Sequence, residues 1–580
     1  MSRTTEGPRR LGTDRAPLPE SISLFQLPGT VSARVVGKQT EQELEARKGV
    51  LTSTAWRERA FERLTDTPEP FRSLLDSHFC WIQPIFNFVY RPAFTRDMKT
   101  GGPYFSQALF NTILSHSVRW CRAEPGMDFL LAPFDDGRAF SKDAVRYVFE
   151  DIQHGRSKVP TVQALLLLSA QECGRGNRTQ AWLYSGMAFR LIDDMGICVD
   201  DEKYAKADQL SAEEVEIRNR LFWSCYLWDK IISLYFGRSP VIQNSEISPP
   251  KLLMDDTADL DIWTPHGIPS SHYPPKQAHS VSCFIQVCGL AEVLNQILIY
   301  LYSPSRNLAP SHAYEYALAA GSRLRVWWRD LPDHLRIDLT LSHLECPPSH
   351  IVTLNCLYHT INILLNRAKL KLSREPELAA AIAEHNPLIQ CVSSATSIIA
   401  LFALYSSAFG ESHVVLALAY SVYTAGSIFL LEAQALGYAA PSTLERLALC
   451  VGTLERLRET SPVLTTACHL MSRELDLLGI QLPEPTTSSN TGLRNQQLAT
   501  RSLQSFPIDE RAAPPPPITN QPTTDTSCAY EDTILLDQLY LDQSGTSMHY
   551  NLLDMPLEVF ENFSRIEPIS VVMDPGVNMY

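Results

Sequence analysis

The sequence predicts an all-α protein, and three observations support this prediction. Long apolar stretches with the spacing of a helix face dominate residues 68–482. Strand-like runs are few, and among the Asn-Gly and Asp-Gly turns that close β-hairpins only Asp136-Gly137 occurs. The 580 residues are 45% hydrophobic and 20% charged, which is enough apolar sequence for a large core. We therefore expect a large helical bundle or superhelix with disordered N- and C-terminal segments.

Composition divides the chain into four units. Residues 1–67 are mixed and flexible, with one short helix around Glu41–Arg63, and residues 68–482 carry the helical pattern. Residues 483–530 form a Pro/Thr/Ser-rich linker that cannot bury enough surface to order itself. Residues 531–580 interleave acidic and large apolar side chains, and the last 80 residues hold 12 of the 64 acidic but 3 of the 50 basic residues. This tail is a separate compositional unit.

Two helices can be placed from local signals. Gly101-Gly102-Pro103 breaks the chain and puts proline at a first helical position, after which Phe105, Leu109 and Ile113 follow at four-residue spacing. Val414–Leu431 is an uncharged stretch at the length threshold of a membrane span. The stretch contains several hydroxyl side chains and has no flanking basic cluster, so it is interpreted as a buried core helix and not as a membrane span.

The central helix is predicted from its two ends. Ser211 and Glu214 have the spacing of a capping box, which marks a helix start. The residues that follow are apolar almost all round the helix, so this helix should lie at the centre of the fold. Gly237 and Pro240 end it, where a C-cap and a helix breaker belong.

Catalytic signatures are almost absent from the sequence, and we expect no enzymatic activity. Asp255-Asp256-Thr257-Ala258-Asp259 is the serious exception, because all-α enzymes use such a DDxxD on a helix to bind Mg²⁺ and a prenyl diphosphate. Proline-rich flanks place this one in a loop, so a solvated acidic loop is favoured and a magnesium site stays the alternative. His116 is interpreted as a satisfied histidine of an amphipathic helix, not as a ligand or base.

Binding of nucleic acid or nucleotides leaves little trace. A net charge of −14 argues against a protein that coats nucleic acid. The 13 cysteines include no C-x-x-C and no six-cysteine zinc-cluster spacing, so no zinc cofactor is expected, and their apolar contexts indicate a reducing intracellular compartment. Gly174–Thr179 is interpreted as a corner between helices and not as a dinucleotide loop. The basic run Arg367–Arg374 is interpreted as a helix surface face, with a weak nuclear-import signal as the alternative.

Several stretches between residues 68 and 482 resemble the fungal-specific transcription factor domain. This is the regulatory middle homology region of zinc binuclear cluster proteins, here similar to the nitrogen-assimilation and xylanolytic-activator branch. The strongest piece is Arg218–Lys230 followed by Gly237-Arg238-Ser239-Pro240, where Ser239 is inserted into the family's Gly-Arg-Pro turn. The other matching stretches are Phe71–Phe79, Pro84–Phe94, Gly102–Ser106, Ala181–Gly196 and Leu357–Arg367.

The residues that carry this resemblance are interpreted as fold determinants and not as catalytic groups. They are Trp182, Gly186, Arg190, Arg218, Arg220, Trp223, Tyr226, Asp229, Gly237, Arg238 and Pro240. Charges beside a nearly all-apolar helix must be paired when they are buried. We therefore expect Asp229 to pair with Arg238 or Arg220 and to lock the central helix to the turn that follows it.

The resemblance implies a nuclear regulator of RNA polymerase II transcription. In the family a zinc cluster contacts DNA and holds two zinc ions, but its cysteines are not in this sequence. The expectation is either that a first exon is missing from this chain or that it is a DNA-free coregulator that reaches DNA through a partner. Homodimerisation stays open, and no membrane partner is expected.

The acidic tail predicts an activation region without help from the resemblance. Acidic residues keep large apolar side chains solvated until a coactivator groove binds them as a short helix. A solubilising tail without a partner is the alternative. The apolar residues expected to contact the transcription machinery or a coactivator are Leu535, Leu536, Leu539, Tyr540, Leu552, Leu553, Phe560 and Phe563.

Overall fold

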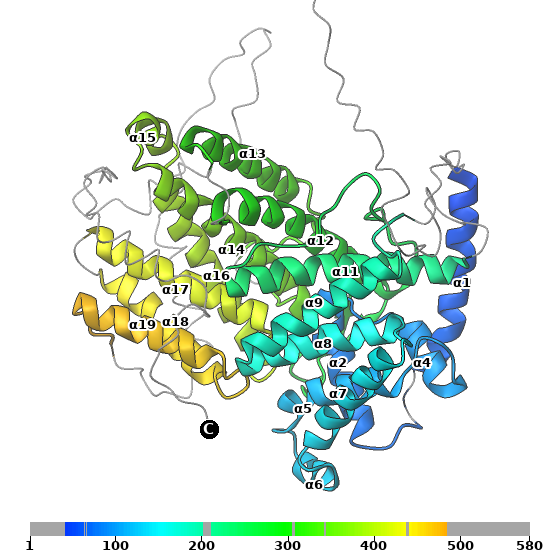
Figure 1. Cartoon of the computed structure of the whole chain (residues 1–580). Helices are drawn as coiled ribbons and strands as arrows, with labels where there is room; N and C mark the ends of the chain where they lie inside the picture. Colours follow the sequence, from blue (N-terminus) through cyan, green and yellow to red (C-terminus); the bar gives the residue numbers. More distant parts are fainter. Residues whose placement is uncertain are drawn as a thin grey trace, which may run out of the picture.

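The computed structural model describes residues 41–483, except for residues 63, 65, 201–209, 304–307, 342–343 and 437–439. Helices make up nearly all of its regular structure, so the all-α prediction is confirmed (Figure 1). The first half contains α1 (Glu41–Glu62), α2 (Phe71–Trp81), α3 (Gln83–Phe86), α4 (Arg91–Thr100), α5 (Gln107–Cys121), α6 (Met127–Leu131), the 3₁₀ turn η2 (Ala132–Phe134), α7 (Arg138–Gln153), α8 (Val159–Arg175), α9 (Arg178–Asp194) and α11 (Ala212–Phe236).

The second half is helical apart from one minimal hairpin. It contains the 3₁₀ turn η4 (Thr257–Asp259), α12 (Ser280–Ile297), the π-helical turn η5 (Leu298–Tyr302), α13 (Pro310–Arg329), α14 (Ser349–Leu372), α15 (Pro376–Ala383), α16 (Pro387–Phe409), α17 (Leu416–Leu436), α18 (Pro441–Leu457) and α19 (Leu464–Leu478). In the hairpin, β1 (Ile262–Trp263) pairs antiparallel with β2 (Lys276–Gln277), with Trp263 opposite Lys276.

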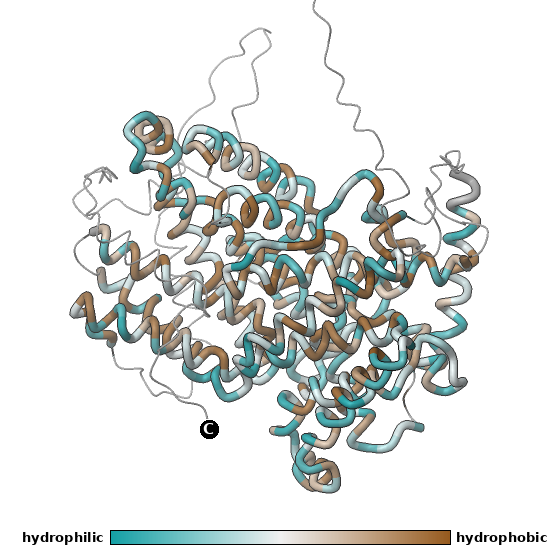
Figure 2. Tube along the Cα trace, in the orientation of Figure 1, coloured by the Kyte–Doolittle hydropathy of each residue, from teal (hydrophilic) through white to brown (hydrophobic). Residues whose placement is uncertain are grey.

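The helices form one body around one large apolar core. α2 to α9 pack together at one end, α13 to α19 pack at the other, and α11 and α12 lie between them (Figure 1). The main apolar cluster has members from Leu64 to Leu475, and Tyr90, Ala93 and Ile217 form a small second cluster. Figure 2 shows apolar residues concentrated along the central helices, while α1 at the edge is mainly hydrophilic.

The boundaries of α11 agree with the sequence signals. The Ser211 hydroxyl accepts a hydrogen bond from the Glu214 N–H at 3.2 Å, and the Glu214 carboxylate accepts one from the Ser211 N–H at 2.7 Å. Gly237 ends the helix with φ +61°, a left-handed conformation that glycine adopts without strain. Every residue from Asn219 to Phe236 is buried, so the prediction of a central helix is confirmed.

The helix expected to start at Pro103 starts later. α5 begins at Gln107, because the Ser106 hydroxyl accepts a hydrogen bond from the Leu109 N–H at 3.1 Å and so caps the first turn. The preceding glycines form a turn over Asp97, whose carboxylate accepts from the Tyr104 N–H at 2.8 Å. A side chain at Gly102 would approach the Asp97 carboxylate within 2.3 Å, so this turn requires glycine.

Three other sequence interpretations can be compared with the fold. By length and composition, Ser280–Tyr302, Pro387–Phe409 and Leu416–Ala435 could each cross a membrane, but 94% of the last window is buried, as expected for the core helix predicted there. α8 ends at Arg175 and α9 starts at Arg178, with Gly176 at φ +87°, which confirms the helix corner. In the basic run Lys371 is exposed but Lys369 is buried, so the surface-face interpretation is wrong for Lys369.

Candidate functional site around the central helix

A pair of adjacent opposite charges is fully buried on α11. The Lys230 ammonium donates to the Asp229 carboxylate at 2.6 Å, and both side chains have 0% exposure. Lys230 also donates to the Ile242 carbonyl and lies 4.1 Å from the centre of the Tyr226 ring. Burial lowers the pKa of Lys230, and the Asp229 charge opposes this shift.

The expected pairing of Asp229 with Arg238 or Arg220 is wrong. The Asp229 carboxylate instead accepts hydrogen bonds from the N–H groups of Val241, at 3.0 Å, and Ile242, at 2.9 Å. Asp229 thus still ties α11 to the segment after its C-terminal turn, but through backbone groups. The long Lys230 side chain reaches its sequence neighbour although adjacent helical residues point in different directions.

The two arginines proposed as partners of Asp229 bind elsewhere. Arg238 stacks on the Trp182 ring at 4.6 Å, which joins the end of α11 to α9. Burial is the main cause that lowers the pKa of Arg238. The inserted Ser239 is exposed and shares a hydrogen bond with Ser303 at 3.0 Å, while Pro240 is buried.

The remaining residues that carry the family resemblance differ in their surroundings. Trp223 donates from Nε1 to the Pro250 carbonyl at 3.0 Å, and Arg218 donates to the Met195 carbonyl at 3.2 Å. Gly186 and Arg190 lie on the exposed face of α9, and a side chain at Gly186 would have nothing within 4 Å.

A second buried network joins α11 to the loop that carries the DDxxD. Arg220 binds the Glu216 carboxylate at 2.7 Å and the Asp255 carbonyl at 2.5 Å. The Tyr90 hydroxyl donates to the Asp255 carboxylate at 2.7 Å, and the Met254 N–H donates to Glu216 at 2.9 Å. Burial alone would lower the pKa of Arg220, but the Glu216 and Asp255 charges raise it, so the guanidinium stays charged.

The three carboxylates of the DDxxD are each bound by a different partner. Asp255 is 2% exposed, so the expectation of a solvated loop is wrong for it. Asp256 pairs with Lys48 of α1 at 2.9 Å. Asp259 accepts from the Val281 N–H at 2.7 Å and thereby caps the first turn of α12. The segment is a loop with a 3₁₀ turn, and its carboxylates diverge, so the magnesium enzyme alternative is not favoured.

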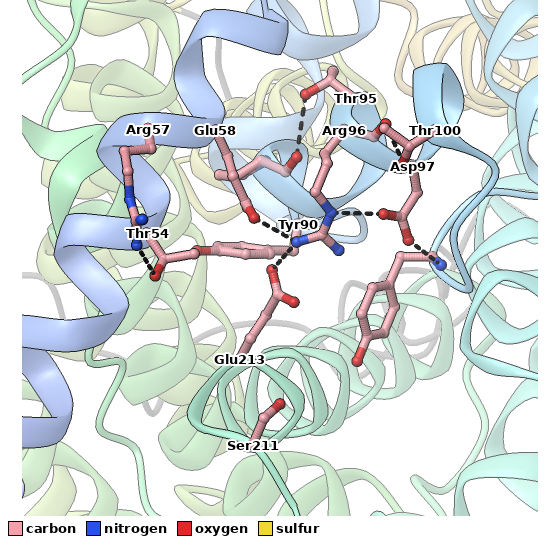
Figure 3. Close-up of polar contacts among 12 residues, drawn as sticks. Thr54, Arg57, Glu58, Tyr90, Thr95, Arg96, Asp97, Thr100, Ser211 and Glu213 are labelled. Atoms are coloured by element: carbon pink, nitrogen blue, oxygen red, sulfur yellow. Dashed lines mark hydrogen bonds and ion pairs between the residues drawn. The ribbon is translucent and has the colours of Figure 1, made fainter.

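A third group of charged contacts is centred on Arg96 (Figure 3). We call this group, the Asp229–Lys230 pair and the Arg220 network the three charged nodes. The Arg96 guanidinium binds the carboxylates of Glu58 at 2.5 Å, Asp97 at 2.7 Å and Glu213 at 2.8 Å (Figure 3). These side chains come from α1, α4 and the first turn of α11. Burial alone would lower the pKa of Arg96, but the three carboxylates raise it above its ordinary value.

α1 is fastened to the body by a row of charged contacts. Besides Glu58, it contributes Lys48, Arg59 and Glu62, which pair with Asp256, Asp261 and Arg91 respectively. An open depression of about 650 Å³ is lined by α1 residues alone, between Glu45 and Arg57. No second helix contributes to this lining, so the depression lacks the converging groups of a small-molecule site.

Several buried cysteine and histidine side chains of the helical body have pKa values shifted by burial. Burial raises the pKa of Cys173 to about 12 and lowers that of His350 and His359 to about 4, so these side chains are neutral near pH 7. His116 is buried against Trp120, with its pKa well below the ordinary value. Burial confirms its place in the core, but its Nδ1 has no hydrogen-bond partner among the described residues, so the expected satisfaction is incomplete.

The sequence interpretation missed several members of these networks. Glu58, Tyr90, Arg96, Glu216 and Lys230 are all half-buried or buried charged or polar groups at shared contacts. The usable signal was the position of Glu216, four residues before Arg220 on the same helix. The tail residues from Leu535 to Phe563 and residues 1–40 lie outside the described residues.

Comparison with known proteins shows what this helical body is similar to. Residues 75–329, which include α11 and its networks, match the fungal specific transcription factor domain. Over these residues the chain is similar to that domain. This confirms the resemblance read from the sequence, although the helical body continues beyond residue 329 to α19.

The curated relatives are fungal transcription regulators. The chain is 25% identical to the nitrogen assimilation transcription factor nit-4 of Neurospora crassa over 83% of this chain, and 28% identical to the nitrogen assimilation transcription factor nirA of Emericella nidulans over 64%. It is 26% identical to the activatory protein CHA4 of Saccharomyces cerevisiae over 48%. These matches cover 44%, 41% and 43% of the relatives' own lengths, so the chain spans less than half of each. No solved structure matches the chain.

Proposed function

We propose that this protein regulates transcription by RNA polymerase II in the nucleus. The observation that carries the proposal is the match of residues 75–329 to the fungal specific transcription factor domain, because every one of the three relatives above is named as a transcription factor or activator. The buried ionic networks of α11 belong to that matched part. In this proposal the helical body is the regulatory part, and residues 531–580 are the activating part.

The chain reaches promoter DNA in one of two ways under this proposal. Either a DNA-binding module joined upstream contacts DNA, or a partner protein carries the chain there. The net charge of −14 favours contact through a separate basic module or partner, because direct phosphate binding requires a basic face.

A tethering assay tests the proposal directly. The full chain is fused to an unrelated DNA-binding domain and placed upstream of a reporter gene in a fungal cell. We expect reporter expression well above that of the DNA-binding domain alone. Deletion of residues 531–580 should reduce it at least tenfold, while equal protein levels on a blot exclude loss through degradation.

Point variants separate activation from simple solubility. Leu535, Leu536 and Leu539 are changed together to alanine, which keeps the acidic charge and removes the apolar groups that a coactivator groove would bind. The matched control changes Thr523, Thr524 and Ser527 in the linker to alanine. Loss of activation in the leucine variant alone supports an activating tail, and full activation in both contradicts it.

A fluorescent fusion of the full chain tests the location. Nuclear fluorescence in a fungal cell is the expected result. Fluorescence that is confined to the cytoplasm under all growth conditions, together with no activation when tethered, would overturn the proposed function.

A further inference from the structure

Three side chains that can bind a metal converge beside α5, away from the networks of α11. The Cys121 sulfur, a Glu124 carboxylate oxygen and a His266 ring nitrogen all lie within 4.8 Å of one another. Cys121 is the last residue of α5, and Glu124 follows it in a turn closed by the hydrogen bond from the Glu124 N–H to the Cys121 carbonyl at 2.9 Å. The pair is therefore held by local backbone geometry.

His266 is brought to this turn by a loop that is pinned to α2. Its backbone N–H donates to the Cys80 sulfur at 3.2 Å, and the nearby Trp263 side chain donates to the Cys80 carbonyl at 3.2 Å. The following Gly267 adopts φ +79°, and a side chain there would lie 3.3 Å from Glu124 Oε1. Glycine thus allows the loop to approach the carboxylate closely.

Two of the three ligand atoms of this cluster, on Glu124 and His266, lack a hydrogen bond among the described residues, and the Cys121 thiol has only weak contacts. His266 Nε2 is 3.2 Å from Glu124 Oε1, yet neither atom has a hydrogen-bond partner of suitable geometry among the described residues. The Cys121 thiol has a weak contact at 3.9 Å, with the Ser73 carbonyl. Buried polar atoms that lie this close together without a hydrogen bond are expected where an ion binds both of them.

His413 provides a second, independent observation at the same place. It is 6% exposed, and neither of its ring nitrogens has a hydrogen-bond partner among the described residues. Its ring stacks on Trp81 at 4.6 Å, and its Nε2 would be 3.6 Å from a side chain at Gly267, the position that also approaches Glu124. A buried imidazole without partners costs free energy unless something binds it.

We propose that Cys121, Glu124 and His266 bind a zinc ion, with His413 or a water molecule at the fourth position. Thiolate, imidazole and carboxylate are the ligand types of zinc, and this mixed set is unlike the all-oxygen sets of magnesium and calcium. Ligand atoms around tetrahedral zinc stand about 3.5 Å apart, so the present separations need a closure of about 1 Å. The exposed fractions of Glu124 and His266, 21% and 20%, leave a path for entry.

Zinc binding at this site exchanges one proton for one metal bond. Cysteine binds zinc as the thiolate, so Cys121 must lose its thiol proton when the metal binds. The zinc–sulfur bond forms as the S–H bond breaks, and the proton leaves to water. The ion would join the end of α5 to the loop after β1 and so act as a structural clasp, and His413 as the fourth ligand would add the loop between α16 and α17.

The test measures metal content and a cobalt spectrum on the full chain. Protein expressed with added zinc and purified without chelators should contain about one zinc per chain. Replacement by Co²⁺ should produce the sulfur-to-cobalt absorption band of a thiolate ligand. Cys121→Ser should abolish that band, and His266→Gln and Glu124→Gln should each weaken zinc binding at least tenfold.

Matched controls make the result decisive. Cys173→Ser removes another buried thiol, and His272→Gln removes an exposed histidine of the same loop, and both should keep zinc and the cobalt band. If Cys121→Ser does not fold, the two partly exposed ligands Glu124 and His266 still decide the outcome. Wild-type protein without zinc and without the cobalt band overturns the proposal. Equal zinc content in all variants means adventitious metal only and also overturns it.

Discussion

Replacing Asp229 with alanine is the sharpest test of how α11 is held. The change removes the only carboxylate within reach of the buried Lys230 ammonium in the described chain, and it also removes the acceptor of two backbone N–H groups. Lys230 cannot turn to water, because its side chain has 0% exposure. The variant protein must bury an unpaired charge or neutralise it.

The expected cost follows from that geometry. Removing one partner of a buried ion pair costs about 3–5 kcal/mol, because the other charge stays desolvated. Total stabilities are about 5–15 kcal/mol, so a large part of the free energy of unfolding would be lost. Asp229→Ala combined with Lys230→Met removes both charges. This double variant should recover about 2 kcal/mol or more relative to the single variant.

Urea unfolding followed by tryptophan fluorescence measures these differences. Two of the nine tryptophans, Trp223 and Trp228, lie on α11 itself, so the signal includes the helix concerned. Asp143→Ala is the control, since it breaks an ion pair with Arg146 whose side chains are 45% and 48% exposed. Exposed pairs contribute about 0–1 kcal/mol, so the control should unfold almost like the wild type.

Two results would refute the reasoning. If Asp229→Ala unfolds at the same urea concentration as the Asp143→Ala control, Asp229 does not hold the helix. If the double variant is no more stable than Asp229→Ala, the loss comes from the unpaired N–H groups and not from the stranded charge of Lys230.

Three further predictions concern the other polar contacts. Arg96→Ala should release α1 and speed its cleavage by trypsin at least tenfold at low salt, whereas Arg138→Ala, at an exposed pair, should leave it unchanged. Tyr90→Phe should cost about 1.5–3 kcal/mol in urea unfolding, because Asp255 loses a charged hydrogen bond; no change would contradict that contact. The free energy of unfolding should be highest above pH 6.5 and fall as the pH is lowered below it. The loss is up to about 1.4 kcal/mol per pH unit for each buried histidine, because the unfolded chain binds protons that the folded chain does not bind. A melting temperature that stays constant from pH 7 to 5 would exclude this, given the folded pKa values of about 3 for His78 and about 4 for His350 and His359.

Local features were predictable from the sequence because local residues cause them. The capping box of Ser211 and Glu214 and the C-cap at Gly237 depend on residues within one turn, and both are present. The all-α class follows from apolar spacing, which any helix must show on its buried face. The start of α5 was predicted at Pro103, but the helix begins at Gln107. The Ser106 side chain caps the first turn, and this cap fixes the start more strongly than the proline does.

The ionic partners could not be predicted because they depend on the packing of distant segments. The burial of Asp255 depends on Tyr90 and Arg220, which are far away in sequence. The sequence predicted Arg238 or Arg220 as the partner of Asp229, but the partner is the adjacent Lys230. The rules for side-chain pairs on a helix favour residues three or four positions apart and do not predict a pair of neighbours. The proposed zinc ligands show only Cys121 and Glu124 as a local pair, and His266 joins them through the fold alone.

The three charged nodes place a strong restriction on the position of α11. Glu213 binds α4 through Arg96, Arg220 binds the loop at Asp255, and Asp229 binds the segment at Val241, so charges recur along the helix from its first turn to near its end. Buried ion pairs add little net stability over apolar residues of the same shape. A shift of α11 by one turn would nevertheless move each charge away from its partner and against the apolar core. The cost of an unpaired buried charge would then arise at several places at once, and apolar contacts, which are non-directional, would not impose such a penalty. The charged nodes therefore select one register of the central helix, and through it one arrangement of the helices packed around it.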